Sequence, residues 1–465
     1  MRQKALVLAF ITSMIAQSVH ATDLVQAYET ARASDPQFAQ AQANKQYQQE
    51  GENQARAVLL PQISGTGSLT KTDTSYSGVH GSASQTSRSL GIQGRQTLFN
   101  WAQFSTLRAQ RDLRQASDFT LAAAQQELIT RTAKAYFAAL VAVESLSAAQ
   151  ANEDSSKQQY LYTQKRLDVG LAPITDVYES RANYDQARAN VLTARSALLD
   201  ACQALSQITG QPISQLRGLP PVFHAKIPNR FSHLDQLLDT ATTSNPTLIA
   251  ANLQTQAAES NVKAAYAGHL PTVSLNGNLG RSKAWGSGDL NQLNGPNGFG
   301  NPTTQTNSIG VTLQIPIFAG GLTQSQVRQS VAQREIQQES YEQTKRALTR
   351  DTRNLYQSLV SGVAEIEARR LSVVSAKSAL EASQVGLRVG TRSLLAVVQN
   401  QNSYYEAQKA YAQARYNFLQ NRLLLAQDLG QLSFADIEEI NRLLTEDSSL
   451  QLAQGPLETE TMPTP

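Results

Sequence analysis

Residues 388–399 read RVGTRSLLAVVQ and interrupt a long helical pattern in the second half of the sequence. Gly390 directly follows that pattern, where glycine favours the left-handed conformation that ends many helices. A related stretch, VGLAPITD, occupies residues 169–176 in the first half. Its Gly170 follows a helical pattern in the same way, and Pro173 suits the start of the next helix. The two stretches predict two helical hairpins, each closed by a glycine turn.

The sequence around these turns repeats once along the chain. Pro36 recurs as Pro246 and the Leu-Pro pair at 60–61 recurs at 270–271, both at an offset of 210 residues. The glycine turns recur at an offset of 220 residues (390 − 170). Self-similarity of this kind indicates one structural unit that is used twice. The sequence therefore predicts two structural repeats, residues 22–230 and 231–444.

Each repeat contains the same predicted elements in the same order: a helix, two strands, a very long helix, the turn and another helix. In the first repeat the elements after the opening helix are strands 61–70 and 87–99, and helices 103–168 and 174–208. In the second repeat they are strands 271–280 and 307–318, and helices 321–387 and 393–429. At about 1.5 Å per residue, each long helix would extend for roughly 100 Å.

The long helices carry a narrow apolar stripe with spacings of seven and four residues, which is the pattern of a coiled coil. In the second long helix the stripe comprises Tyr341, Leu348, Leu355, Leu359, Val363 and Ile366. The stripe alone does not distinguish a tube of helices from an ordinary extended coiled coil without a pore. The predicted strands decide between these two interpretations.

The predicted strands alternate between apolar and polar residues. Leu90 and Ile92 alternate with Ser89 and Gly91, and residues 307–318 follow the same rule. Strands of about ten residues with one apolar and one wet face are typical of transmembrane β-barrels. Four strands cannot close a barrel, and an open edge in lipid leaves backbone groups without hydrogen bonds. The chain is therefore expected to form an oligomer, although the strands do not fix the number of copies.

Composition and charge narrow the functional classes. The chain of 465 residues contains 41% apolar and 17% charged residues. Residues 1–21 are predicted to form a secretory signal, with Arg2 and Lys4 before an apolar run and Ala21 at the cleavage point. Their removal changes the formal charge from +3 to +1, so nucleic acid is not an expected partner.

Residues 445–465 have the composition of a disordered tail.

No catalytic, cofactor or metal site is expected. The five histidines are scattered without ligand spacing, and no glycine motif that could hold a phosphate precedes a helix. Cys202 is the single cysteine, which excludes an intrachain disulfide. Carboxylates such as Glu365 and Glu367 lie among alternating charges, which are typical of a solvated helix face. The sequence therefore predicts that the protein is not an enzyme.

Several short segments carry a family resemblance that covers about residues 22–444. They are LPQ (60–62), TLF (97–99), VG and ITDV (169–170 and 174–177), QITG (207–210), GHLP (268–271), VGTR (389–392) and ARYN (414–417). In this order they resemble the TolC family of outer-membrane channels for type I secretion and multidrug efflux. The resemblance implies an α+β membrane protein that forms a homotrimer. Four strands per chain would build one shared β-barrel above a long periplasmic α-helical barrel.

The resemblance also implies partners and a mode of action. An inner-membrane pump of the ABC or RND type and a periplasmic adaptor protein would dock below the helical barrel. They would open it by untwisting its helices, and the channel would then conduct substrates passively. Outer-membrane lipid would surround the strands. The alternative is a periplasmic adaptor or a structural coiled-coil protein without a pore, but neither accounts for four amphipathic strands.

The resemblance further implies a gate at the two glycine turns. Arg392 matches a family arginine, and Thr175 and Asp176 match its partners on the other turn. We therefore expect a charge-assisted hydrogen bond from Arg392 to Asp176. The family tyrosine that also bonds to this aspartate falls at Leu387, which has no hydroxyl group. That part of the family's network is therefore expected to be absent or replaced.

The family's periplasmic constriction carries paired aspartates, which fall here at Ala396 and Gln399. Neither side chain is charged, and no acidic residue lies between residues 388 and 405. A ring of carboxylates in a narrow pore attracts cations. We therefore expect weaker cation selectivity than the family norm and little block by multivalent cations.

Overall fold

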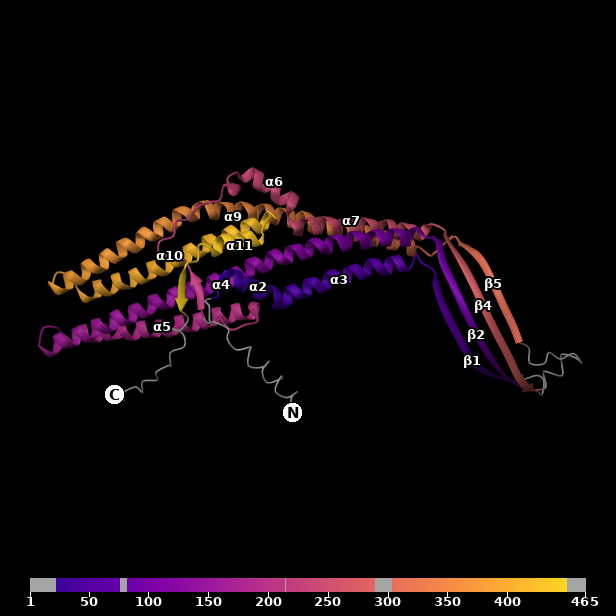
Figure 1. Cartoon of the computed structure of the whole chain (residues 1–465), viewed down its shortest axis with the longest axis horizontal. Coiled ribbons are helices and arrows are strands. Elements are labelled where there is room, and N and C mark those ends of the chain that lie inside the picture. The colour runs from indigo at the N-terminus through magenta and orange to yellow at the C-terminus, as the bar shows by residue number, and fades with distance from the viewer. Residues whose placement is uncertain (1–21, 76–81, 214, 289–302, 450–465) are drawn as a thin grey trace, which may run out of the picture. The chain divides into compact units, whose positions relative to one another are not determined.

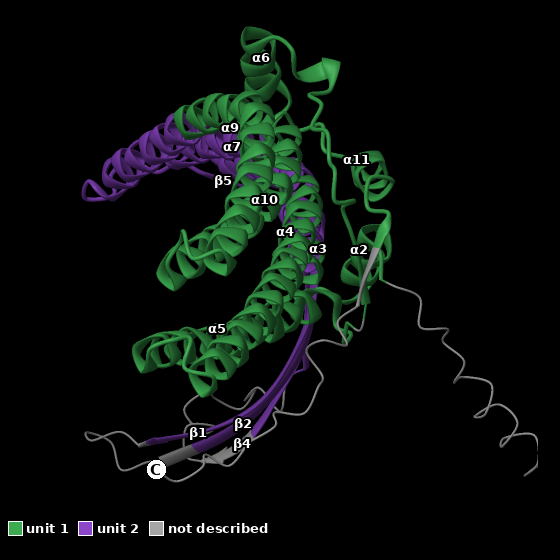
Figure 2. Cartoon of the chain, turned by 90° about the vertical axis from the view of Figure 1, so that its left-hand side faces the viewer, with its two compact units in different colours: residues 1–42, 120–248, 345–465 green, residues 43–119, 249–344 purple. Residues whose placement is uncertain are grey.

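The structure is a computed structural model that describes residues 22–75, 82–213, 215–288 and 303–449. The predicted signal, residues 1–21, lies outside the described residues. The chain divides into two compact units (Figure 2). Unit 1 comprises residues 1–42, 120–248 and 345–465, and unit 2 comprises residues 43–119 and 249–344. Each unit therefore draws on both predicted repeats.

Unit 2 contains a four-stranded antiparallel sheet, whose strands lie side by side in the order β1-β2-β4-β5 (Figure 1). These strands are β1 (Gln62–Ser75), β2 (Ser82–Phe99), β4 (Thr272–Gly288) and β5 (Thr303–Gln314). The sheet thus consists of two hairpins, one from each repeat, which meet where β2 pairs with β4. Unit 2 also contains most of α3 (Pro36–Ala57) and α7 (Pro246–Tyr266), the short η3 (Ala267–His269), and the beginnings of α4 (Trp101–Asp168) and α9 (Leu322–Arg388).

The strands differ in length from those that the apolar alternation predicts. β1 and β2 stay paired as far as Ser75 and Ser82, and β4 continues to Gly288, where the composition predicts polar loops. Backbone hydrogen bonds hold these ends together, and they do not require apolar side chains. β5 ends at Gln314 and not at residue 318, because Pro316 has no N–H with which to continue the ladder.

Unit 1 consists mainly of two helical hairpins. The first joins the remainder of α4 to α5 (Ile174–Thr209), and the second joins the remainder of α9 to α10 (Leu394–Asp428). Both turns lie at the same end of unit 1 (Figure 1). α4 begins two residues before the predicted position 103, and the other ends of these four helices lie within one residue of the predicted bounds. Within the described ranges, no helix is both long and apolar enough to cross a bilayer.

Each repeat opens with two helices where the sequence predicts one. The pairs are α2 (Leu24–Ser34) with α3, and α6 (Leu234–Ser244) with α7. A proline follows each break, and the residue before a proline disfavours helix. The Asp35 carboxylate accepts a hydrogen bond from the Phe38 N–H at 2.8 Å, and the Asn245 side-chain oxygen accepts one from the Leu248 N–H at 3.1 Å. Both side chains thereby cap the second helix of the pair.

A small second sheet belongs to unit 1. Its strands β3 (Gln215–Gly218) and β6 (Glu446–Ser449) pair antiparallel. The prediction of a disordered tail from residue 445 is therefore wrong at 446–449, because backbone pairing with β3 orders a polar segment that has no apolar pattern of its own. Residues 450–465 lie outside the described residues. The remaining short helices of this unit are η2 (Asn229–Phe231) and α11 (Phe434–Asn441).

Asp428 lies half-buried in the last turn of α10, and its environment makes stability depend on pH. Burial raises the pKa of Asp428 to about 6, Asp351 adds to the rise, and a hydrogen bond from Thr352 opposes it. The pKa of Asp428 is higher in the folded chain than in the unfolded chain, so the folded state binds the proton more tightly. The free energy of unfolding therefore increases as the pH falls from about 6 toward 4, and this gain is lost as the pH rises through 6. We expect Asp428→Asn to stabilise the protein at pH 7.5 by about 1–2 kcal/mol, allowing for partial solvent screening.

Thermal melting of the detergent-solubilised protein at pH 5 and pH 7.5 tests this prediction. The wild type should melt at a higher temperature at pH 5, and Asp428→Asn should reduce that difference. Asp239→Asn, which replaces an exposed carboxylate on α6, serves as the control. An unchanged difference in Asp428→Asn would assign the pH dependence to another group.

Candidate channel and gate

The sheet in unit 2 has one apolar and one polar face. Directly opposed residues of antiparallel strands share a face, and the register places Ile63, Ile92, Leu279 and Ile309 on one side, here called the outer face. Ile63 is 76% exposed and Ile309 is 81% exposed. The opposite, inner face carries polar residues, including Ser64, Ser89, Gln93, Asn276, Asn278, Ser308 and Thr312. In a β-barrel, the apolar outer face would contact lipid and the polar inner face would contact water in the pore.

The edges of this sheet lack partners within a single chain. In the part of the chain that the structure describes, β1 and β5 each pair with a neighbour on one side only. In lipid, an unpaired strand edge leaves backbone N–H and C=O groups unsatisfied at several kcal/mol each. Strands from other copies of the chain can satisfy these edges. Three copies would contribute about twelve strands, which is enough for an open barrel, whereas eight strands leave room only for side chains.

The two hairpin turns have the same backbone construction. Gly170 and Gly390 adopt φ values of 73° and 80°, in the left-handed region. The Leu171 N–H donates to the Arg166 carbonyl at 2.7 Å, and the corresponding bond in the second turn, from the Thr391 N–H to the Gly386 carbonyl, is 2.8 Å long. Bonds of this type satisfy the last carbonyls of a helix. The turns are therefore built for sharp reversal at the tips of the hairpins.

The three gating residues expected from the sequence lie at these turns. Asp176 occupies the first turn of α5, where the partial positive charge of the helix N-terminus favours a carboxylate. Thr175 precedes it and is exposed, and Arg392 is exposed in the second turn. Within the described chain, no ion pair joins Arg392 to Asp176. The expected bond therefore stays a prediction, and it requires a neighbouring chain or another state of the hairpins.

The side chain of Arg392 is positioned by a glycine in the preceding helix. A Cβ atom added to Gly386 would lie 2.6 Å from Cγ of Arg392. The Arg392 N–H also donates to the Gly386 carbonyl at 3.2 Å. The stem of Arg392 thus packs on the helix backbone, which directs where its guanidinium group can reach. Leu387, which follows Gly386 in the sequence, is half-buried.

The residues of the expected constriction lie near the start of α10. Gln399 is exposed and Ala396 is half-buried. They are three residues apart and therefore share one side of the helix. Ser393 caps this helix, since its hydroxyl accepts a hydrogen bond from the Ala396 N–H at 3.3 Å. Carboxylates at 396 and 399 would therefore project from a fixed helix start.

A buried polar network that the sequence reasoning missed joins the two hairpins. Gln401 of α10 is 1% exposed, and its Nε2 donates to Oδ1 of Asn152 at 2.6 Å and to Oγ of Ser156 at 2.9 Å. Asn183 of α5 also donates to Ser156 at 3.1 Å. Three helices therefore meet at Ser156 and Gln401. Glutamine and asparagine are common throughout this sequence, so composition gives no signal for these positions.

An aromatic pair lies next to this network. The hydroxyl of Tyr405 donates to the Ala151 carbonyl at 3.0 Å. Burial raises the pKa of Tyr405, and Tyr404 and Asp154 add to the rise. Tyr405 therefore stays a neutral donor at physiological pH. Together with Gln401, it supports α10 against α4 above the turns.

Most of the chain matches one protein family. Residues 27–211 and 237–431 match the family described as outer membrane efflux protein, with one match in each repeat. The chain belongs to this family. The two matched segments coincide with the duplication seen in the sequence and in the two hairpins. An outer membrane efflux protein is a channel, which agrees with a sheet that has an apolar and a polar face.

This outer membrane efflux protein is similar to curated relatives over most of its length. It is 33% identical to outer membrane protein TolC of Escherichia coli (strain K12), across 92% of this chain and 86% of the relative. It is 26% identical to the alkaline protease secretion protein AprF of Pseudomonas aeruginosa, across 91% of this chain and 88% of the relative. Among solved structures, the Campylobacter jejuni CmeC outer membrane channel shares the fold with a TM-score of 0.74 at 18% identity, covering 93% of this chain and 94% of that chain.

These similarities establish the architecture and location of the protein. It is a TolC-like trimeric channel of the outer membrane, with a shared β-barrel and a helical tunnel in the periplasm. Channels of this kind work with efflux or secretion systems. Neither a periplasmic adaptor nor a structural coiled-coil protein accounts for the family match and the two-faced sheet together.

Proposed function

We propose that the trimer is the exit duct of a tripartite system in which a periplasmic adaptor and an inner-membrane pump, of the ABC or RND type, deliver the substrate. The observation that carries this proposal is the two-faced sheet with open edges, because its polar inner face can line a water-filled pore. The pump supplies the energy, and the duct conducts passively. AprF, a relative by sequence, is named as a protease secretion protein, and the family is described as outer membrane efflux protein, so both a secreted protein and an effluxed small molecule fit as cargo.

The tips of the hairpins offer a contact surface for the adaptor. Val169, Leu171, Ile174 and Val389 lie at or beside the turns, and each is more than half exposed. Exposed apolar residues that gather at one place often mark a protein interface. An adaptor with apolar residues at its own tip would cover them. Engagement of both turns would then move the hairpins apart.

Opening is proposed to proceed by untwisting of the hairpins near their tips. The network of Gln401, Asn152 and Ser156 holds α10 against α4 within one chain, and the bond from Arg392 to Asp176 would hold neighbouring chains. Separation of the helices must break the hydrogen bonds within one chain as well as the proposed bond between neighbouring chains. Water can replace these bonds in the open state, so the energy difference between the states stays small.

Arg392→Ser is expected to increase the resting conductance of the channel, because serine keeps the turn but removes the guanidinium that bonds to Asp176. The ratio of open to closed channels should rise by about ten- to one hundred-fold, since a charge-assisted hydrogen bond contributes about 1.5–3 kcal/mol. Single-channel recording in planar bilayers measures it. Arg388→Ser is the matched control, because Arg388 is also exposed and lies four residues earlier. Equal leak in the two variants, or no leak in either, would rule out the proposed bond.

Membrane extraction followed by recording tests the duct itself. The protein should require detergent for release and migrate as a compact oligomer, and the purified oligomer should give a small, steady conductance. Release by salt alone, or a folded oligomer without conductance, would contradict the proposal. The need for detergent and the conductance both distinguish a membrane channel from a peripheral protein, whereas helical hairpins occur in both.

A further inference from the structure

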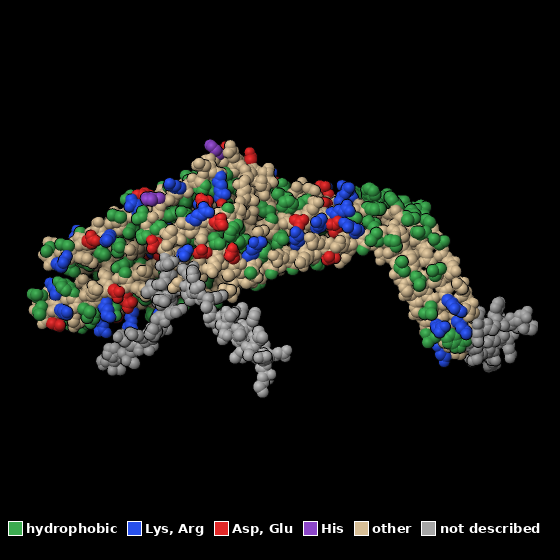
Figure 3. All heavy atoms as spheres, viewed as in Figure 1, with side chains coloured by type: hydrophobic (Ala, Val, Ile, Leu, Met, Phe, Trp, Pro, Cys, Tyr) green, Lys and Arg blue, Asp and Glu red, His purple; other side chains and the backbone are tan. Residues whose placement is uncertain are grey.

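Four basic side chains gather on the outer face of the sheet near the ends of its hairpins. They are Lys71, Arg88, Arg281 and Lys283, here called the outer basic cluster. Arg88 pairs directly with Lys283 in the ladder between β2 and β4, and Leu90 pairs with Arg281. The cluster therefore shares the face of the exposed apolar residues. Figure 3 shows basic side chains gathered among apolar ones near that end of the strands.

The cluster lies at the height where the apolar part of the membrane ends. Val273 lies in the first paired rows of β4, and Lys283 is ten residues further along the strand (283 − 273). At about 3.3 Å per residue and a tilt of about 40°, this distance corresponds to roughly 25 Å, the usual height of the apolar band of a barrel. Trp285, 38% exposed, lies on the same face one row further. Tryptophan favours this interfacial level.

The positive charge of the cluster is not balanced by the sheet. Arg88 directly opposes Lys283, and like charges at such positions destabilise a sheet. Asp73, 3.6 Å from Lys71, is the one carboxylate on the described parts of β1, β2, β4 and β5. The connecting segments 76–81 and 289–302 add one carboxylate in sequence, Asp289. An external anion between the strands would remove this repulsion.

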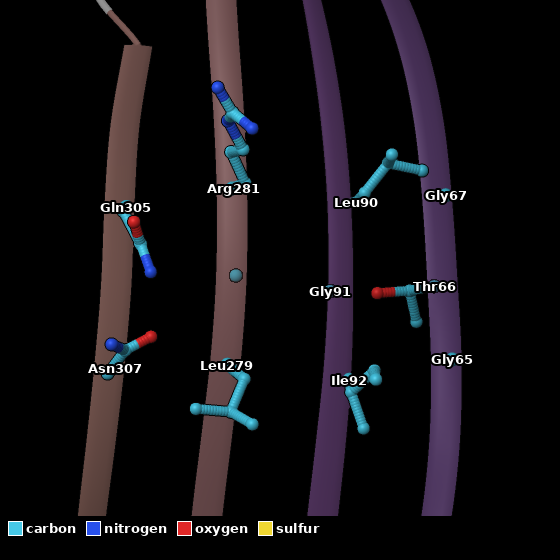
Figure 4. Close-up of a pocket in the computed structure, with 11 residues that line it drawn as sticks. Gly65, Thr66, Gly67, Leu90, Gly91, Ile92, Leu279, Arg281, Gln305 and Asn307 are labelled. Carbon is cyan, nitrogen blue, oxygen red and sulfur yellow. The ribbon is translucent and has the colours of Figure 1, made fainter.

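A shallow hollow of about 690 Å³ extends along the neighbouring rows of the sheet (Figure 4). Its lining includes Leu90, Ile92, Leu279 and Arg281, Gly65 and Gly67 of β1, and the polar side chains of Gln305 and Asn307 on β5. A Cβ atom on Gly65 would meet nothing within 4 Å, so this part of the strand leaves open space. The part of the hollow between Leu90, Ile92 and Leu279 is apolar and has the cation of Arg281 at one end, which suits an acyl chain whose headgroup is anionic.

We propose that the outer basic cluster binds the phosphate groups of a phosphorylated glycolipid in the outer leaflet of the outer membrane. The charge and the height of the cluster match the phosphates of such a lipid, and the hollow beside Arg281 matches its acyl chains. Binding would fix the trimer to its lipid surroundings. This site is independent of the cargo and of the gate at the hairpin turns.

Native mass spectrometry of the purified trimer with added bis-phosphorylated lipid A tests the proposal. We expect the wild type to retain this lipid, and the triple variant R88Q/R281Q/K283Q to bind it about 100-fold more weakly, because each cation near a charged membrane surface contributes about a five-fold change. Arg95→Gln is the matched control, since Arg95 lies on the inner face of β2. Channel conductance confirms that each variant still forms a pore.

Two comparisons on the wild type need no variant. Dephosphorylated lipid A should bind far more weakly than the phosphorylated form, and phosphatidylglycerol, with its single phosphate, should compete poorly. Equal binding of the dephosphorylated lipid would show that apolar contact alone holds the lipid and would overturn the proposal. Equal binding of phosphatidylglycerol, or loss of binding in Arg95→Gln to the same extent as in the triple variant, would also overturn it.

Discussion

Replacement of Ala396 and Gln399 with aspartate is expected to make the channel strongly cation-selective and sensitive to block by trivalent cations. Each chain then contributes two carboxylates, and the trimer contains a ring of six. Charged rings in a narrow pore determine which ions enter, and carboxylate oxygens are preferred ligands of hard cations. Both residues lie on one side of a capped helix start, so the new carboxylates would gather close together. Block should become at least about ten-fold tighter, which corresponds to 1.4 kcal/mol.

The wild type should show weak selectivity and little block, because its residues at these positions are uncharged. Reversal potentials in a salt gradient and titration with a trivalent cation measure both properties, at low ionic strength where screening is small. The variant with asparagine at 396 and 399 controls for size and polarity. Strong selectivity in the wild type would reveal another acidic ring. An aspartate variant that behaves like the asparagine variant would place the constriction elsewhere.

The sequence predicts those parts of the fold that leave a periodic mark within one chain. The alternation of Leu90 and Ile92 with polar residues predicts a strand with two different faces, because strand side chains alternate between the faces of a sheet. The glycine at position 390 predicts the end of a helix from the local sequence alone, because few other residues adopt the positive φ that such an end requires. The duplication follows from fixed offsets between prolines. All of these signals can be read without knowledge of any long-range contact.

The parts that sequence reasoning missed depend on contacts between distant segments. The hairpin ends at Ser75 and Ser82 pair through the backbone, which leaves no side-chain pattern. The strand at 446–449 exists because β3 offers it an edge. Gln401 is buried only because Asn152, far away in sequence, provides a partner. The bond from Arg392 to Asp176 is a different case, because the family resemblance predicts it and the described residues of one chain do not form it, so it stays a prediction.

Gly430→Ala is expected to destabilise the protein severely, and a series of three glycines separates the causes. Gly390, Gly210 and Gly430 each follow a helix with φ values of 80°, 70° and 66°. A Cβ atom on Gly390 would meet nothing within 4 Å, whereas one on Gly210 would lie 3.1 Å from Cβ of Ser34. On Gly430 it would lie 2.3 Å from the carbonyl oxygen of Ser244. Backbone atoms cannot rotate away as a side chain can, so the third substitution must displace α6.

The backbone conformation alone makes alanine about 1–2 kcal/mol less favourable at each of the three sites. Overpacking should add about 1–3 kcal/mol at Gly430 and less at Gly210. Melting temperatures of the purified trimers should therefore decrease in the order Gly390→Ala, Gly210→Ala, Gly430→Ala. Because the φ values are nearly equal, the conformational contribution cancels in the comparison, and the order reports how closely α2 and α6 approach the ends of α5 and α10. Equal losses in all three variants would show that the positive φ accounts for the whole effect and that the close approach of Ser244 contributes nothing.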